Sequence, residues 1–414
     1  MTDLRFGPRL MARLDQLGRI SSDSDRLTRL PFTPAHRQAL EQVRAWMHEA
    51  GMITRVDVIG NLIGRYEGDD PDAPALLIGS HIDSVVAAGR YDGPLGILSG
   101  IDAVHALHQQ GDRLPFPIDV VAFCDEEGVR FTTTFLGSRA ICGTLDPAVF
   151  EVRDRDGTSL ADALRAFGGD PDRLGEAAYS QGSIRGFLEV HIEQGPVLEA
   201  EDRAVGIVTA IQGQSRMVVC LDGMAGHAGT VPMGHRRDAL AGAAEMILFV
   251  ERRCAAVPEL VGTVGRIDAQ PGAVNVIPGR VLFTVDLRAP NDLIRGQAAS
   301  EVVQGIQRIA ASRGLACSIG REHDQRAMAC APRLQRWLAQ ALRAEGLPVK
   351  YLASGAGHDA MAMAECCPAA MLFVRCKSGI SHNPLESITV EDADVAVRVL
   401  LRVLRDLIPP EASS

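Results

Sequence analysis

One short stretch of this sequence combines histidine with acidic residues in a way that suggests a metal site. His81 and Asp83 directly follow an apolar run, 73–78, that predicts a buried strand. At the end of such a strand, one of the two side chains could bind an ion while the other holds the imidazole from behind. Asp92 lies just before a predicted helix start and could bridge two cations. The alternative role for Asp92 is that of a helix cap.

A pair of acidic residues follows a second apolar run. Glu126 and Glu127 come soon after the predicted strand 117–123. Carboxylates at the end of a buried strand are costly unless the protein uses their charge, and ligands of open α/β sheets bind at the carboxyl ends of the strands. One carboxylate could bind a cation while its neighbour transfers protons. A solvated loop is the alternative interpretation.

Two more histidines lie near the ends of predicted strands. His191 belongs to the alternating stretch 186–192, and His382 follows the apolar run 369–374. A lone histidine would more often be a core residue, but a third imidazole at a strand end favours a metal site. Imidazole and carboxylate together suit zinc, manganese, cobalt or nickel better than calcium or magnesium. The candidate ligands are His81, Asp92, Glu127, His191 and His382.

These residues are spread along the chain, so the fold has to bring them together. The chain has 414 residues, which is more than one hydrophobic core usually serves. From about residue 211, strand-like and helix-like segments follow in the order β-α-β-β-α-β, which predicts a small α/β domain inserted into a larger one. We expect a discontinuous catalytic domain, 1–210 and 328–414, and an inserted domain, 211–327.

The composition excludes several classes of partner. The chain is 46% hydrophobic and 23% charged, as in ordinary globular proteins, and its net charge of −10 argues against a nucleic acid or an anionic membrane as partner. No segment approaches the roughly 20 apolar residues that a membrane span needs. The first residues lack the pattern of a secretion signal, and the nine scattered cysteines are expected to be reduced and unpaired. A cytoplasmic location is therefore expected.

Together these motifs closely resemble those of the two-metal amidohydrolases in the hydantoinase/carbamoylase branch of the zinc-aminopeptidase-like superfamily. This branch includes allantoate amidohydrolases, N-carbamoyl-L-amino acid hydrolases and β-ureidopropionases. The resemblance covers nearly the whole chain and is carried by eleven blocks. These blocks are GSHIDSV, YDGPLGI, DEEGVRF, FLGSRA, EVHIEQGP, GHAGTVPM, RRDAL, NVIPG, DLR, SGAGHDA and GISHNPLE.

The resemblance implies an α/β fold with a mixed-sheet, aminopeptidase-like catalytic domain and an inserted ferredoxin-like lid and dimerisation domain. It implies two divalent ions per subunit, zinc or manganese with cobalt or nickel possible, held by the five candidate ligands and bridged by Asp92. It assigns Asp83 to orienting His81, and Glu126 to general base catalysis. His227 would stabilise the oxyanion in the partner subunit of a homodimer. The matching substrate contacts are His227, Gln194, Asn275, Arg288, Gly357 and His358.

Within this branch, several stretches favour allantoate as the substrate. Arg288 could bind a substrate carboxylate with its guanidinium fork, although without the resemblance a surface ion pair would be expected there. Arg216 stands where relatives that act on carbamoyl amino acids often carry an aromatic residue. Allantoate has a carboxylate and two ureido arms, so a second cationic contact suits it. We expect hydrolysis of a ureido C–N bond of allantoate to ureidoglycine or its breakdown product, carbon dioxide and ammonia.

Other substrates and roles stay open at this stage. The nearest alternative is an N-carbamoyl-L-amino acid hydrolase or a β-ureidopropionase, which would use the same chemistry. The complete ligand set argues against a binding protein without catalysis, and the HIEQGP block favours ureido substrates over peptides. Three departures from the family pattern leave the substrate open, namely Phe131-Thr132-Thr133, His235 and Leu385.

Overall fold

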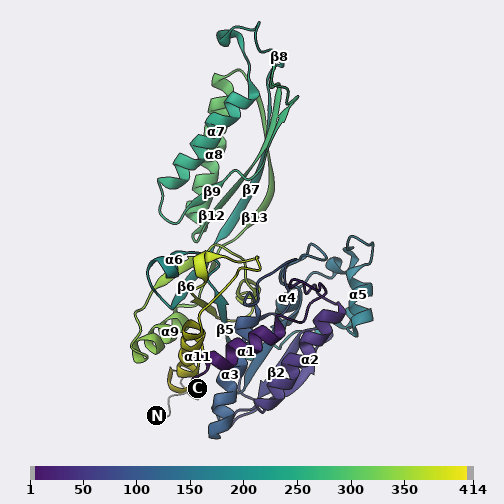
Figure 1. Ribbon diagram of the computed structural model, residues 1–414, viewed down its shortest axis with the longest axis vertical. Helices are drawn as coiled ribbons and strands as arrows, with labels where there is room; N and C mark the ends of the chain where they lie inside the picture. Colours follow the sequence, from purple (N-terminus) through teal and green to yellow (C-terminus); the bar gives the residue numbers. More distant parts are fainter. Residues whose placement is uncertain (1–4, 408–414) are drawn as a thin grey trace. The chain divides into compact units, whose positions relative to one another are not determined.

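The computed structural model describes residues 5–407 and separates into two compact units (Figure 1). Unit 1 contains the chain up to Thr209, Cys330–Leu352 and the chain from Gly357 onward. Unit 2 contains Ala210–Ala329 and Ala353–Ala356. Within residues 5–407, no helix has the length and apolar character needed to cross a membrane.

The larger sheet is mixed and has nine strands, in the order β1-β2-β4-β3-β5-β16-β6-β14, with β15 paired to β6. Its central strands β4 (Ile118–Phe123), β3 (Ala75–His81), β5 (Ile184–Ile192) and β16 (Ala369–Val374) run parallel. Every residue of these four strands is buried, as expected for parallel strands covered on both faces. The other strands are β1 (Ile53–Val56), β2 (Leu62–Tyr66), β6 (Val205–Ile211), β14 (Met328–Ala329) and β15 (Tyr351–Ser354).

Helix α3 (Pro94–Gln110) packs against the central strands and against α1 and α11. Gly93 precedes it with φ at +83°, and a Cβ at this position would lie 2.4 Å from the carbonyl oxygen of His81. Only glycine therefore allows the helix to begin this close to β3. The other α-helices of unit 1 are α1 (Gly7–Leu17), α2 (Pro34–Glu49), α4 (Leu136–Cys142), α5 (Leu160–Phe167), α6 (Val197–Ala200), α9 (Pro332–Ala344), α10 (Asp359–Met363) and α11 (Val390–Arg402).

Unit 2 contains an antiparallel five-stranded sheet in the order β10-β12-β7-β13, with β9 paired to β12. Helices α7 (Ala239–Ala255) and α8 (Asp292–Ser312) lie side by side on one face of this sheet (Figure 1), where alternate apolar residues of β7 (Gly213–Asp222) and β12 (Arg280–Ala289) form the core. The mixed α/β class expected from the sequence is confirmed. The remaining strands are β8 (Gly226–His227), β9 (Val261–Thr263), β10 (Ile267–Gln270), β11 (Val276–Ile277) and β13 (Ala316–Gln325).

The cysteines differ from the expectation. Cys142 and Cys366 form a disulfide with a Cα–Cα distance of 5.3 Å. The two residues are 224 positions apart, so their spacing in the sequence gives no sign of the pair. Packing of α4 against α10 brings them together. The expectation that all nine cysteines are unpaired is therefore wrong, although the other seven are free.

Candidate metal centre

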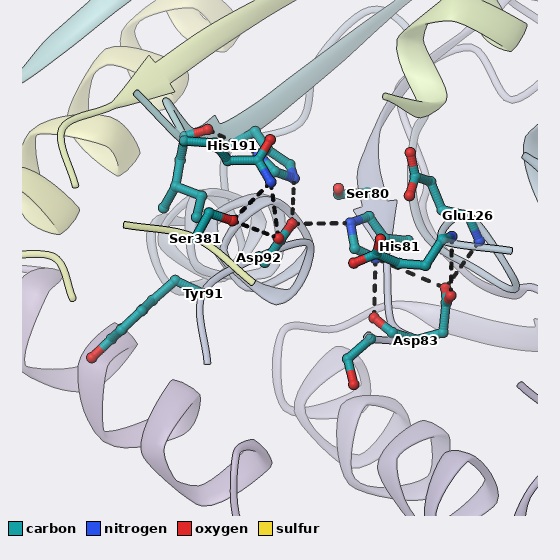
Figure 2. A network of polar contacts seen from close by, with 12 residues as sticks. Ser80, His81, Asp83, Tyr91, Asp92, Glu126, His191 and Ser381 are labelled. Carbon is teal, nitrogen blue, oxygen red and sulfur yellow. Dashed lines mark hydrogen bonds and ion pairs between the residues drawn. The ribbon is translucent and has the colours of Figure 1, made fainter. Parts of the chain in front are cut away.

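Asp92 is the residue on which the candidate metal site converges (Figure 2). One of its carboxylate oxygens lies 3.4 Å from Nε2 of His81 and 3.1 Å from Nε2 of His191. The other oxygen lies 3.2 Å from Nε2 of His382. Three imidazoles thus direct the same ring nitrogen toward one buried carboxylate.

The parallel strands explain why these residues meet. His81 is the last residue of β3 and His191 is the penultimate residue of β5, and the carboxyl ends of parallel neighbours lie at one edge of the sheet. Asp92 comes just before Gly93 and the start of α3. His382 follows β16 in a loop and has a φ of +53°.

The potential ligands form two groups that share Asp92. His81, Asp92 and His191 make one group, and Asp92, Glu127 and His382 make the other, with the ligand atoms of each group within 4.8 Å of one another. Nε2 of His191 is buried and has no hydrogen-bond partner in the described part of the chain. A cation would satisfy this nitrogen, and imidazole with carboxylate is a donor set that zinc and manganese accept. The residues present therefore fit divalent metal ions.

The orientation of two imidazoles is fixed by main-chain carbonyls. Nδ1 of His81 lies 3.0 Å from the carbonyl oxygen of Asp83, and Nδ1 of His191 lies 2.9 Å from that of Ile192. A carbonyl oxygen only accepts hydrogen bonds, so each Nδ1 carries the proton and donates it. The lone pair of each Nε2 is then free to bind an ion.

The carboxylate of Asp83 has a different position from the one the sequence suggested. It lies 3.8 Å from Nδ1 of His81 and accepts hydrogen bonds from the backbone N–H groups of Glu126 (3.1 Å) and Glu127 (3.2 Å). Figure 2 shows Asp83 between His81 and Glu126. Asp83 therefore links the end of β3 to the acidic pair that follows β4, and its carbonyl, rather than its carboxylate, holds the imidazole.

The electrostatics of these side chains suit proton transfer. Glu126 is only 7% exposed; burial and the nearby Glu127 charge raise its pKa well above the ordinary value, although His81 acts in the opposite sense. Burial also opposes the charge of Asp92, but the neighbouring imidazoles hold its pKa well below the ordinary range. Contact with Asp92 raises the pKa of His382 to about 9. A buried glutamate with a raised pKa can accept a proton and return it.

Three side chains hold Asp92 and its loop. Nε2 of Gln194 and Oγ of Ser381 donate to one oxygen of Asp92 at 2.9 Å and 3.0 Å. The buried carboxylate of Glu386 accepts the backbone N–H groups of Tyr91 (2.8 Å) and Asp92 (3.2 Å). The sequence suggested Gln194 as a substrate contact and missed Ser381 and Glu386. Both missed residues lie in the GISHNPLE block, which was the available signal.

A second buried acid lies behind His191. Glu189 accepts hydrogen bonds from Oγ of Ser80 (2.7 Å) and from the backbone N–H of Ala360 (2.9 Å). The ring of His358, suggested as a substrate contact, lies 4.4 Å from the ring of His191. The sequence analysis missed Glu189, although a glutamate inside an apolar strand is a usable signal.

Two arginines suggested as substrate contacts share a carboxylate on the face of the unit 2 sheet opposite α7 and α8. Arg288 donates to both oxygens of Asp286, at 3.2 Å and 3.1 Å, and to the carbonyl oxygen of Gly355 at 2.8 Å. Nε of Arg216 and Nε2 of Gln214 also donate to Asp286, at 3.2 Å and 2.7 Å. Arg216, Asp286 and Arg288 line a pocket of about 430 Å³ within this unit. Asp286 was not suggested by the sequence.

The remaining suggested residues also have clear positions. His227 and Asn275 are exposed in unit 2, where the backbone N–H of Ala228 donates to the carbonyl oxygen of Asn275 beside the β8–β11 pair. Gly357 belongs to unit 1, as do the candidate ligands. A role of His227 in a partner subunit stays a prediction.

Comparison with known proteins identifies the family. Residues 77–406 match the model of peptidase family M20/M25/M40. The chain belongs to this family. It is 42% identical to an N-carbamoyl-L-amino acid amidohydrolase of Geobacillus stearothermophilus over 402 residues, covering 97% of this chain and 98% of that one. It is also 42% identical to an allantoate deiminase of Arabidopsis thaliana over 427 residues, covering 95% and 81%.

Solved structures agree with this assignment. An amidase of the hydantoinase/carbamoylase family from Burkholderia multivorans superposes with a TM-score of 0.91 at 34% identity, covering 98% of both chains. The suspected resemblance is thereby confirmed, and the protein is a hydrolase that acts on C–N bonds. The curated relatives do not distinguish allantoate from N-carbamoyl-L-amino acids as the substrate.

Proposed function

We propose that this protein is a metal-dependent amidohydrolase that cleaves a ureido C–N bond of allantoate. The observation that carries the proposal is the convergence of three imidazoles on Asp92, with the buried carboxyl group of Glu126 nearby. The shared position of Asp92 supports a pair of divalent ions, zinc or manganese. The set consists of His81, Asp92, Glu127, His191 and His382.

The protein's own residues would move the protons. Divalent ions at such a centre lower the pKa of water and polarise a carbonyl group. As water adds to the ureido carbonyl, Glu126 accepts its proton and passes it to the nitrogen as the C–N bond breaks. The carbamate that leaves decomposes to carbon dioxide and ammonia. Asp83 supports this role because its carboxylate holds the backbone N–H of Glu126.

Unit 2 would supply recognition of the substrate carboxylate. A guanidinium carries five N–H groups, and Arg288 uses three of them on Asp286 and Gly355. One N–H remains on each terminal nitrogen, and such a pair binds a carboxylate in two-pronged fashion. Among the hydrogen bonds of residues 5–407, Arg216 donates through its Nε alone, and its terminal nitrogens would contact a ureido arm. Further contacts are proposed for Gln194, His227, Asn275, Gly357 and His358.

We also propose that the active form is a homodimer in the cytoplasm. The exposed ring of His227 would enter the active site of the partner subunit and stabilise the oxyanion. Met224, Met233 and Val274 are exposed in unit 2, with accessibilities of 57%, 77% and 103% relative to a fully exposed residue of the same type. A contact with a partner subunit would remove these apolar side chains from water.

The decisive experiment is ammonia release by metal-stripped protein after addition of manganese or zinc. Allantoate, N-carbamoyl-L-methionine and N-carbamoyl-β-alanine are offered separately. Metal-dependent release from allantoate alone supports the proposal. Turnover of a carbamoyl amino acid instead would support ureido hydrolysis but refute allantoate as the substrate. This alternative is supported by the N-carbamoyl-L-amino acid amidohydrolase that is also 42% identical. No ammonia release from any of the three compounds would refute ureido hydrolysis.

A further inference from the structure

Arg29 is a buried arginine with no carboxylate partner. Its side chain is 0% exposed, and no ion pair of the described residues includes it. Its Nε donates to the carbonyl oxygen of Ile82 at 2.7 Å, and Nη1 donates to those of Leu17 (3.0 Å) and Ile20 (3.1 Å). Buried charges are usually paired with an opposite charge, so this arrangement needs a reason other than an ion pair.

The main chain of Arg29 is joined to the segment that follows β3. The N–H of Arg29 donates to Oγ of Ser84 at 2.9 Å, and the N–H of Ser84 donates to the carbonyl oxygen of Arg29 at 3.0 Å. Together with the bond to Ile82, three hydrogen bonds hold residues 82–84 against one residue. The neighbouring bond from the N–H of Ala88 to the carbonyl oxygen of Leu27, 2.8 Å, extends the contact.

Asp83 is the middle residue of the segment that Arg29 holds. Its carbonyl oxygen accepts from Nδ1 of His81, and its carboxylate accepts the N–H groups of Glu126 and Glu127. Figure 2 shows the contacts of Asp83 with His81 and with Glu126. A displacement of segment 82–84 would therefore move a candidate ligand on β3 and the acidic pair after β4 at the same time.

The charge of Arg29 persists at neutral pH. Burial lowers the pKa of its guanidinium to about 10, while the charge of Asp83 acts in the opposite sense. The guanidinium is therefore positive when the enzyme works, and its planar shape lets it reach carbonyl groups of three residues at once. A lysine has the charge but not this geometry.

We propose that Arg29 is a positioning residue of the metal centre, which fixes segment 82–84 so that Asp83 aligns His81 with Glu126 and Glu127. The inference rests on the proposed metal centre but not on the identity of the substrate. It predicts that loss of Arg29 weakens metal binding beyond its effect on the stability of the fold. Residues that orient metal ligands from behind typically affect metal affinity by about 10–100-fold.

The test compares Arg29→Met and Arg29→Lys with the matched control Arg13→Met. Arg13 is also buried, at 8% exposure, but its partners are Asp102 and Glu49, and neither is a candidate ligand or part of segment 82–84. Each metal-free variant is titrated with manganese or zinc, and the dissociation constant and the metal-dependent rise in Tm are measured. All three substitutions are expected to lower the Tm of the metal-free protein.

Only the Arg29 variants are expected to bind metal more weakly. The dissociation constant should rise by about 10–100-fold in Arg29→Met and by less in Arg29→Lys. Wild-type metal affinity in Arg29→Met overturns the inference, as does an equal loss in Arg13→Met. If Arg29→Met does not fold, wild-type affinity in Arg29→Lys overturns it instead. A wild-type protein that binds neither metal refutes the metal centre itself, and this inference with it. Metal binding without activity on allantoate would refute only the proposed substrate.

Discussion

Acid should destabilise this protein through one buried histidine outside the metal site. His36 lies in the first turn of α2 with 0% of its surface exposed. Its Nδ1 accepts the backbone N–H of Phe32 at 3.0 Å, and its ring stacks on Phe167 with the centroids 4.9 Å apart. Burial, followed by the charges of Arg29 and Arg37, lowers the pKa of His36 to about 3. The native protein therefore holds this imidazole neutral.

The magnitude follows from the difference between the native and unfolded pKa. The unfolded chain binds a proton at His36 below its ordinary pKa of 6.5, whereas the native protein does so only near 3. Above about pH 6.5 neither state binds this proton, so His36 does not lower the free energy of unfolding. As the pH falls from 6.5 toward 3, only the unfolded chain binds the proton, and the free energy of unfolding decreases. The loss is about 1.4 kcal/mol per pH unit, or about 2 kcal/mol between pH 7 and pH 5.

The assay is urea unfolding of the metal-free protein at pH 7 and pH 5. The wild type should lose about 2 kcal/mol more unfolding free energy between these conditions than His36→Gln, which has no titrating ring. His48→Gln is the control, because His48 is exposed on the same helix. Buried acids with raised pKa values, such as Asp102 and Asp119, act in the opposite sense, but they are common to all variants and cancel in the comparison. An equal loss in the wild type and His36→Gln would refute the reasoning.

Four further outcomes are expected. Glu126→Gln should lower kcat about 10²–10⁴-fold, because proton transfer is lost, while metal titration shows unchanged binding. Asp286→Asn should raise KM for the carboxylate substrate roughly tenfold with kcat nearly unchanged, because Arg216 and Arg288 lose their common charged acceptor; an unchanged KM contradicts this. Arg216→Phe should shift preference from allantoate toward apolar N-carbamoyl amino acids, and an unaltered allantoate rate counts against the role of Arg216. Glu386→Ala should cost about 2–4 kcal/mol of unfolding free energy, because two buried N–H groups lose their acceptor, whereas Glu386→Gln should cost less.

The candidate metal ligands could be predicted from the sequence because the patterns that point to them are local. His81 follows an apolar run and His191 lies near the end of an alternating stretch, and both patterns predict strands. The chain direction of parallel strands then places their carboxyl ends at one edge, so the side chains near those ends can be grouped into one site by their positions in the sequence. The α/β class follows from the same runs.

Contacts between residues far apart in the chain leave no comparable pattern in the sequence. Arg29 precedes Ile82 by 53 residues, and Glu386 follows Tyr91 by 295, so neither contact follows from spacing. The disulfide between Cys142 and Cys366 has the same character. At Asp83 it is the carbonyl oxygen, at 3.0 Å, and not the carboxylate, at 3.8 Å, that faces Nδ1 of His81, because backbone direction at a strand end decides which group faces the ring.

The question of substrate therefore concerns unit 2 more than the metal ligands. Hydrolysis of allantoate and of an N-carbamoyl-L-amino acid breaks the same kind of bond, so the proposed metal ligands and Glu126 would serve both substrates and would not discriminate between them. Discrimination requires contacts to the parts of the molecule that do not react. On the face of the sheet opposite α7 and α8, Arg288 has one free N–H on each terminal nitrogen, which fits a carboxylate that both substrates possess. Arg216 lies beside the same Asp286, and among the described residues its terminal nitrogens donate no hydrogen bond. The second ureido arm of allantoate would accept hydrogen bonds from these nitrogens, whereas the apolar side chain of an N-carbamoyl amino acid would not. Under the proposed function, the exchange of Arg216 is therefore the substitution expected to separate the two substrates.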